Sequence, residues 1–232
     1  MGVKMLKKVI ICLAIVVSFQ TQYAQCLDVT ETTTHFTWNF SADEKDTIHP
    51  LMQEMESFYS NIAHDFSYTS DRLVTINVYP DIQAFHDAIG LVDAPDWAVA
   101  RATDEALDIV SLASPGPFHS QESINQIMKL NVVKSIIYDA FGRDNVPYWL
   151  AYGVGALKVG YCTSTPSLDE VPTLDQLECN HYADFKKVNG FQVSCSFVQF
   201  INDTYGWDAV LELLANYDAN KVSYYQEWIE KR

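Results

Sequence analysis

Two neighbouring stretches of this 232-residue chain decide its fold: Lys129-Leu-Asn-Val-Val-Lys-Ser-Ile-Ile-Tyr-Asp-Ala-Phe-Gly142 and Val146-Pro-Tyr-Trp-Leu-Ala-Tyr-Gly-Val-Gly-Ala156. The first stretch completes a helix that we expect to begin near Ser120 and to end before Gly142, a residue type that commonly terminates helices. The second stretch starts the next helix, whose glycines permit a close approach to a neighbour. The expected buried stripe of the first helix consists of Ile124, Ile127, Met128, Leu130, Val133, Ile137 and Phe141.

The spacing of these two helices resembles that of the gluzincin (thermolysin-like) zinc metallopeptidases of the peptidase MA-like family. In that family one helix carries His-Glu-x-x-His and the next helix carries a third ligand in Pro-x-Trp-Leu-x-Glu-Gly. The histidines bind zinc and the first Glu polarises the attacking water. Counting back about eighteen residues from Trp149 aligns the first His with Asn131, the general base with Val132, the second His with Ser135 and the Glu ligand with Tyr152.

None of these four side chains can perform the original role. Asn and Ser are poor zinc ligands, Val cannot transfer a proton, and Tyr would have to lose its phenolic proton to bind metal well. The six histidines are never closer than fourteen residues apart, so no helical His pair exists in any register. The resemblance therefore predicts a catalytically inactive metallopeptidase homologue, a pseudoenzyme, with no catalytic residue, no bound metal and no cofactor.

Many aromatic rings surround the degenerate positions. A tyrosine at position 152 can hydrogen-bond Asn131 or Ser135, which share a helix face one turn apart, and can close the vacant metal position. The same rings could line a cleft for a peptide or protein ligand, or they could be ordinary core residues. The candidate cleft consists of Asn131, Ser135, Tyr138, Tyr148, Trp149 and Tyr152.

Three functions are compatible with this pattern. The first is a secreted pseudopeptidase that binds a peptide or protein in the former active-site cleft. The second is an active extracytoplasmic hydrolase with a non-standard site, which alone would require zinc. The third is a structural secreted protein. A Ser-Lys dyad of Lys134 and Ser135 is disfavoured, because adjacent residues on a helix diverge by about 100°.

The resemblance covers roughly residues 30 to 216 and implies an α+β fold, with a small mixed or antiparallel sheet in the first half packed on a zincin-like helical second half. Alternation predicts a strand over residues 32–40 with Phe36 and Trp38 facing inward and His35 on the surface. A helix should follow from Thr47, with Pro50 in its first turn. The remaining expected strands are residues 73–79 and segments near Ala98 and Ile109, and the remaining expected helices are residues 80–89, 120–141, 146–159, 174–178, 191–204, 207–216 and 222–231.

Residues 1–26 have the composition of a secretory signal peptide. Lys4, Lys7 and Lys8 precede the apolar run Val9–Val17, which is shorter than the ~20 residues of a membrane-spanning helix. We expect residues 27–232 to form a single peptidase MA-like domain, located outside the cytoplasm in a secreted or periplasmic form, with no membrane span.

The expected mature chain is strongly acidic. It keeps all 30 acidic residues but only 12 of the 15 basic ones, which gives a net charge of −18. Such a field repels nucleic acid and anionic membranes, so a nucleic-acid partner is not expected. The sequence leaves the oligomeric state open.

Cysteines outside the cell are expected to pair. The first choice is Cys162 with Cys179, which flank a loop, and the second is Cys26 with Cys195. A zinc cluster of Cys162, Cys179, His181 and Cys195 is the competing possibility, but it lacks any Cys-x-x-Cys spacing.

Overall fold

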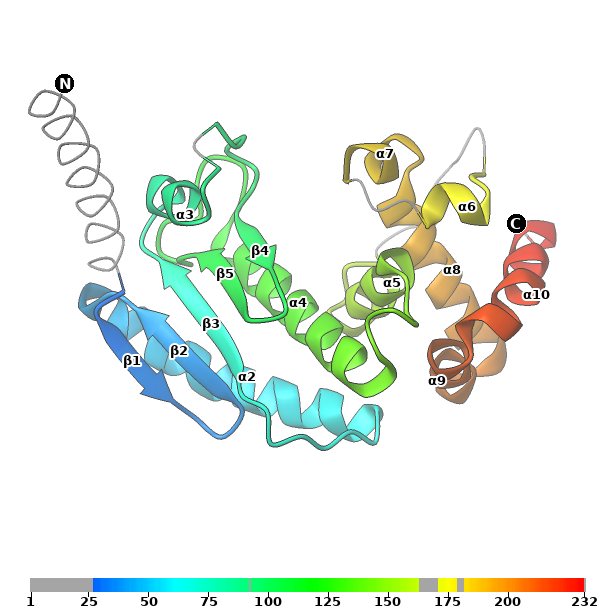
Figure 1. The fold of residues 1–232 in the computed structure, drawn as a ribbon, viewed down its shortest axis with the longest axis horizontal. Coiled ribbons are helices and arrows are strands. Elements are labelled where there is room, and N and C mark those ends of the chain that lie inside the picture. The colour runs from blue at the N-terminus through cyan, green and yellow to red at the C-terminus, as the bar shows by residue number, and fades with distance from the viewer. Residues whose placement is uncertain (1–26, 92, 163–170, 179–181, 232) are drawn as a thin grey trace, which may run out of the picture. The chain divides into compact units, whose positions relative to one another are not determined.

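The computed structural model describes residues 27–91, 93–162, 171–178 and 182–231. They form two compact units. Unit 1 comprises the described residues up to Glu56 together with Asp71–Met128, and unit 2 comprises Ser57–Ser70 together with the described residues from Lys129 onward. The first half contains a mixed sheet and the second half contains helices, which confirms the predicted α+β class (Figure 1).

The sheet of unit 1 has five strands in the order β1-β2-β3-β5-β4. Strands β2, β3 and β5 run parallel, whereas β1 and β4 pair antiparallel with β2 and β5. Strand β4 therefore forms one edge, and a turn that contains Asp104 and Glu105 joins it to β5. The strands are β1 (Val29–Thr32), β2 (Phe36–Phe40), β3 (Val74–Tyr79), β4 (Ala100–Ala102) and β5 (Ala106–Val110).

The predicted strand over residues 32–40 is two strands. A tight turn, closed by the Thr33 amide donating to the Phe36 carbonyl over 2.9 Å, separates β1 from β2. The inward side chains of β2 are fully buried, as their alternation predicts. His35, which we expected at the surface, is half-buried and has a specific partner, since its Nδ1 lies 2.6 Å from Glu56 Oε2.

Helix α2 (Lys45–Asp65) begins two residues earlier than expected, after the short 3₁₀ helix η1 (Ala42–Glu44). Pro50 consequently lies inside the helix and not in its first turn. Helix α3 (Ile82–Ala88) is capped by Asp81, whose carboxylate accepts from the Ala84 amide over 2.8 Å. The boundary between the units falls within α2 and within α4 (Gln121–Phe141).

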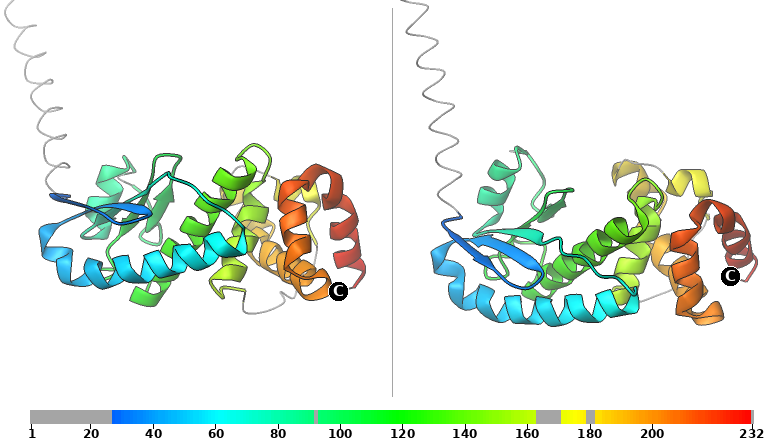
Figure 2. Two further views of the ribbon diagram at one scale, coloured as in Figure 1. Left: turned by 90° about the horizontal axis from the view of Figure 1, so that it is seen from below. Right: turned by 60° about the horizontal axis from the view of Figure 1, so that its bottom comes forward.

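The described residues of unit 2 are mostly helical (Figures 1 and 2). Helix α10 begins five residues earlier than expected, because the ring of Tyr217 is buried against Trp149. The short helix α7 was missed, since it is too brief to show an apolar period. The helices after α4 are α5 (Tyr148–Lys158), α6 (Leu174–Leu177), α7 (Tyr182–Lys187), α8 (Gly190–Tyr205), α9 (Trp207–Ala215) and α10 (Tyr217–Glu230).

Helices α5 and α8 pack at very short range. A Cβ atom added to Gly153 would lie 2.5 Å from the backbone oxygen of Ser194 on α8. No side chain fits at that distance, so the expected close approach of a neighbouring helix is confirmed. This contact fixes α8 directly against the second turn of α5.

Within the described part of the chain, no helix is both long and apolar enough to cross a bilayer. The predicted signal peptide, residues 1–26, lies outside the described residues.

Candidate functional site

The face of α4 that meets α5 carries Leu130 and Lys134. Leu130 packs with Ala156 and Tyr152 of α5. A Cβ atom on Gly155 would lie 3.2 Å from the Leu130 backbone oxygen and 3.7 Å from Lys134 Cγ. The residues facing α5 are thus one position earlier in the chain than Asn131 and Ser135, the pair that the sequence aligned with the zinc histidines.

The three aligned positions of α4 have different surroundings. Val132, aligned with the general base, is 1% exposed and belongs to the core. Asn131 and Ser135 are half-buried. Asn131 Oδ1 accepts a hydrogen bond from Lys134 Nζ over 3.2 Å. The partner of Asn131 at this position is therefore a lysine ammonium from the next helical turn.

Lys134 is a buried cation in unit 2. The residue is 9% exposed, and its Nζ lies 4.7 Å from the centre of the Tyr148 ring. Burial, reinforced by the charge of Arg143, lowers the pKa of Lys134 to about 8. No carboxylate among the described residues pairs with it. The ammonium is held by one amide oxygen and one aromatic face.

Four rings from three helices form an aromatic cluster, defined as Tyr148, Tyr152, Phe185 and Phe191. Tyr148 lies 5.5 Å from Phe185 and 6.2 Å from Tyr152, and Phe191 lies 4.8 Å from both Tyr152 and Phe185. Burial raises the pKa of Tyr152, so its hydroxyl stays protonated. Tyr148 is 37% exposed, which places the edge of the cluster at the surface.

Tyr152, aligned with the third zinc ligand, lies in an apolar environment. It packs against Leu130, Ala156 and Cys195, and its ring contacts Phe191. The structure therefore fills the space between α4 and α5 with Leu130 and the lysine side chain.

Two further residues of the predicted cleft, Trp149 and Tyr138, contact other partners. Trp149 is fully buried, donates from Nε1 to the Tyr217 hydroxyl over 3.1 Å, and contacts Phe197, so its ring is part of the core. Tyr138 stacks against Arg143, whose Cζ lies 4.3 Å from the ring centre. Burial raises the pKa of Tyr138.

The predicted disulfides involve residues outside the described part, because Cys26 and Cys179 are not described, nor is His181 of the competing zinc cluster. Cys162 and Cys195 are both free thiols. Over the described ranges there is also no group of three or more His, Cys, Asp or Glu side chains arranged to hold a metal ion.

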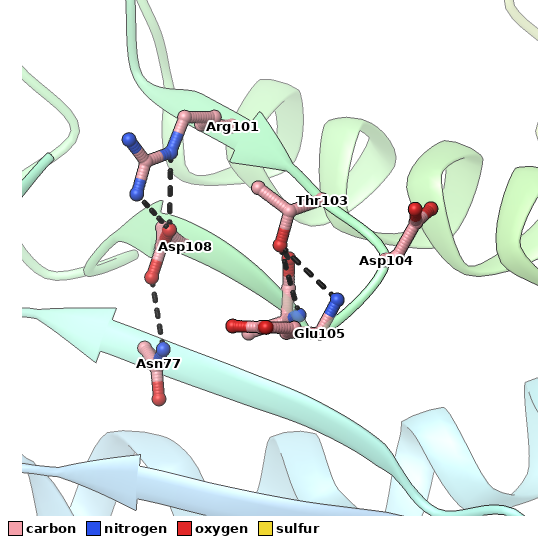
Figure 3. Close-up of a pocket in the computed structure, with 7 residues that line it drawn as sticks. Asn77, Arg101, Thr103, Asp104, Glu105 and Asp108 are labelled. Atoms are coloured by element: carbon pink, nitrogen blue, oxygen red, sulfur yellow. Dashed lines mark hydrogen bonds and ion pairs between the residues drawn. The ribbon is translucent and has the colours of Figure 1, made fainter.

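Unit 1 contains a pocket of about 450 Å³ beside the β4–β5 hairpin (Figure 3). Arg101 and Asp108 point toward one another at its wall, and Thr103 organises the turn by accepting from the amides of Glu105 and Ala106 over 3.2 and 3.1 Å. No motif in the sequence predicted this pocket.

A row of polar side chains crosses the whole sheet at the pocket. Each member is the register partner of the next, from Thr30 through Asn39 and Asn77 to Asp108 and Arg101. Side-chain hydrogen bonds of 2.8–2.9 Å join successive members.

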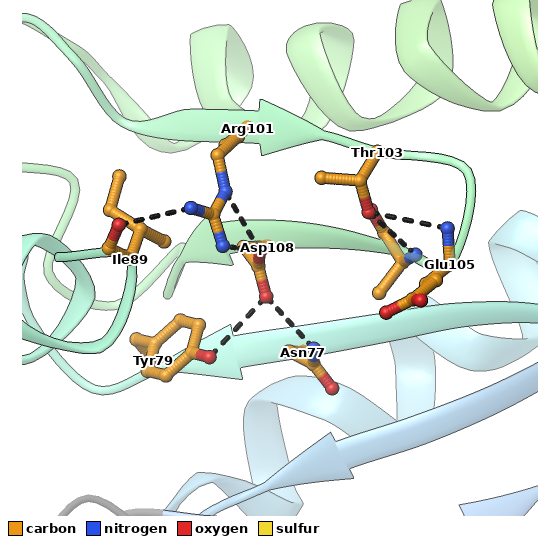
Figure 4. A network of polar contacts seen from close by, with 8 residues as sticks. Asn77, Tyr79, Ile89, Arg101, Thr103, Glu105 and Asp108 are labelled. Carbon is orange, nitrogen blue, oxygen red and sulfur yellow. Dashed lines mark hydrogen bonds and ion pairs between the residues drawn. The ribbon is translucent and has the colours of Figure 1, made fainter.

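Asp108 is saturated with donors. Beyond those bonds it accepts from Tyr79, while Arg101 also donates to the Ile89 carbonyl over 3.0 Å (Figure 4). Because its charges satisfy one another, the row is a structural feature of the sheet. Its signal in the sequence is a polar residue within an otherwise mainly apolar strand, as with Asn77 in β3 and Asp108 in β5.

Comparisons with known proteins add no family to these observations. No protein-family model matches the chain, and no curated protein matches its sequence.

Proposed function

We propose that this protein is an exported, catalytically inactive relative of the gluzincin zinc peptidases that binds a peptide or protein segment through the aromatic cluster of unit 2. The observation that carries the proposal is the Lys134 ammonium beside Asn131, on the α4 face that meets α5. This ammonium belongs to the residue next to Ser135 and binds Asn131, the two positions that the resemblance aligns with the zinc histidines, and it supports a site without metal.

The zinc motif can be aligned with α4 in two ways that differ by one residue, and both lack the zinc ligands. In the first frame the zinc-peptidase positions are Asn131, Val132 and Ser135. In the frame that faces α5 the His positions correspond to Leu130 and Lys134, and the base corresponds to Asn131. Neither frame supplies two neutral imidazoles or a carboxylate base, so the usual zinc-hydroxide chemistry has no residues to support it.

The aromatic cluster supports binding because it combines apolar area with polar tips. Tyrosine is enriched at interfaces since its ring buries well and its hydroxyl can hydrogen-bond. Tyr148 is exposed at the edge of the cluster, and its ring contacts Tyr152 and Phe185. Phe191 in turn packs against both of these rings. The ammonium of Lys134 against the Tyr148 ring fixes the orientation of that ring.

A peptide array probed with the purified protein and two matched variants tests this function. Tyr148→Ala should weaken binding about tenfold or more, the loss typical of a central aromatic residue. Tyr205→Ala is the control, because Tyr205 is a tyrosine of unit 2 with 40% exposure and lies outside the aromatic cluster. Equal binding by all three proteins, or no binding by the wild type, overturns the proposal.

A second candidate function, an active hydrolase with a non-standard centre, is favoured by one observation. A lysine whose pKa is lowered to about 8 can act as a general base or nucleophile near neutral pH. This function predicts turnover of library peptides that rises as the pH passes about 8 and that Lys134→Met abolishes. Failure to cleave any peptide while folding is intact rejects it.

A further inference from the structure

The end of α5 reverses the chain in a way that fixes Cys162. Gly160 adopts a left-handed conformation with φ +71°, and its amide donates to the Leu157 carbonyl over 3.2 Å. The Tyr161 amide donates to the Ala156 carbonyl over 2.8 Å. These two bonds form a Schellman motif, which turns the chain back along the last turn of the helix. Cys162 follows directly and packs against Ala156.

Helix α8 brings Cys195 to the same place. Its neighbour Ser194 is the residue that abuts Gly153 of α5, so the position of α8 along α5 is fixed at this point. Cys195 is 8% exposed and forms a small core with Leu130 and Ala156, on which Cys162 also packs. Two cysteines 33 positions apart in the sequence thus belong to one packed cluster.

The two thiols interact directly. The Cys162 thiol donates a hydrogen bond to the Cys195 sulfur, which raises the pKa of Cys162 and lowers the pKa of Cys195. Cys162 is half-buried and Cys195 is buried, so an external reagent meets Cys162 first.

We propose that Cys162 and Cys195 form an intramolecular disulfide, which joins the end of α5 to α8 when the protein meets an oxidising disulfide compound. This pairing differs from both pairings that the sequence favoured. It also makes unit 2 a redox-responsive unit, since Tyr152 of the aromatic cluster packs against Cys195.

The reaction is a thiol–disulfide exchange. A small external disulfide exchanges with Cys162, giving a mixed disulfide and releasing one external thiol. The sulfur of Cys195 then displaces the second external thiol from Cys162. Overall two S–H bonds break, one S–S bond forms, and the two protons and two electrons reduce the external disulfide to two thiols.

Mass spectrometry of the full chain tests the pairing. The purified protein is incubated with oxidised glutathione, its remaining thiols are alkylated, and it is digested without reductant. We expect a cross-linked peptide pair that contains Cys162 and Cys195, lighter by two hydrogen atoms than the sum of its parts. Reductant should separate the pair.

Matched variants and a second measurement keep the result decisive. Cys179→Ser should retain the cross-link, whereas Cys162→Ser should abolish it. Cys162 is the more exposed partner, so this variant tests the pairing even where Cys195→Ser fails to fold. Oxidation should also raise the urea midpoint of the wild type and leave that of Cys162→Ser unchanged. A cross-link from Cys162 to Cys179 or Cys26, a persistent glutathione adduct, or two cysteines that remain alkylated overturns the proposal.

Discussion

The two units each bury a charged side chain, but they satisfy it to different degrees. In unit 1 the carboxylate of Asp108 accepts from Asn77 over 2.8 Å, from Tyr79 over 3.3 Å, and twice from Arg101. In unit 2 the ammonium of Lys134 donates to Asn131 over 3.2 Å and lies over an aromatic ring. A fully satisfied buried charge specifies a fold, whereas a poorly satisfied one costs stability. A contribution to stability therefore does not explain why a lysine is present at position 134.

The largest expected effect comes from breaking the satisfied network of unit 1. Asp108→Ala should lower the free energy of unfolding by about 3 kcal/mol, because Arg101, Asn77 and Tyr79 each lose a hydrogen bond to the carboxylate. Urea denaturation measures the change. Asp108→Asn, which keeps the shape and one acceptor oxygen, should lose less. A loss below about 1 kcal/mol for the alanine variant would show that the row across the sheet contributes little.

A smaller loss is expected where the helices of unit 2 touch. Gly153→Ala places a methyl group 2.5 Å from the Ser194 backbone oxygen, so the helices must separate, at a cost of about 2 kcal/mol. Gly155→Ala is the matched control in the same helix. Its nearest contact is 3.2 Å, and alanine gains about 1 kcal/mol of helix propensity, so the net change should be small. Thermal unfolding of both variants distinguishes them, and equal midpoints would contradict the close α5–α8 contact.

Removal of the poorly satisfied charge should stabilise the protein. Lys134→Met keeps the length of the side chain and removes the buried ammonium, so at pH 7 we expect a gain of about 1–3 kcal/mol. Denaturation of both proteins across a pH series measures it. Lys129→Met, five residues earlier in the same helix and partly exposed, should give no comparable gain.

The pH dependence of that gain follows from the lowered pKa. The folded chain releases the Lys134 proton near pH 8, while the unfolded chain holds it until about pH 10.5. Between these values the unfolded state binds more protons, so the stability of the wild type rises with pH. Below pH 8 both states are protonated and the cost of burying the charge is fully present. The advantage of Lys134→Met should therefore shrink from pH 8 to pH 10.5, and an advantage that does not change with pH would show that Lys134 is neutral or solvated.

Local sequence patterns predicted the helices and strands well, but they predicted poorly which of these elements contact one another. Gly142, at φ +86°, ends α4 where its residue type indicated. The row that contains Asp108 was missed, because alternation reveals burial but not which strands become neighbours. The face of α4 was misplaced for a related reason. One residue rotates a helix face by about 100°, so the spacing that selected Asn131 could not distinguish it from Leu130.

The cysteines illustrate the same limit. Cys162 and Cys179 are close in sequence, and that closeness favoured their pairing. Cys195 approaches Cys162 only because Gly153 lets α8 pack against α5 and Gly160 turns the chain back. Both steps depend on tertiary structure.

Zinc titration of the purified protein, followed by a peptide-hydrolysis assay with and without chelator, tests the central claim most directly. Because Asn131, Lys134 and Tyr152 supply no imidazole pair and no carboxylate, we predict no stoichiometric zinc binding and no chelator-sensitive hydrolysis. One zinc ion per chain, together with peptide cleavage that a chelator abolishes and added zinc restores, would contradict the account.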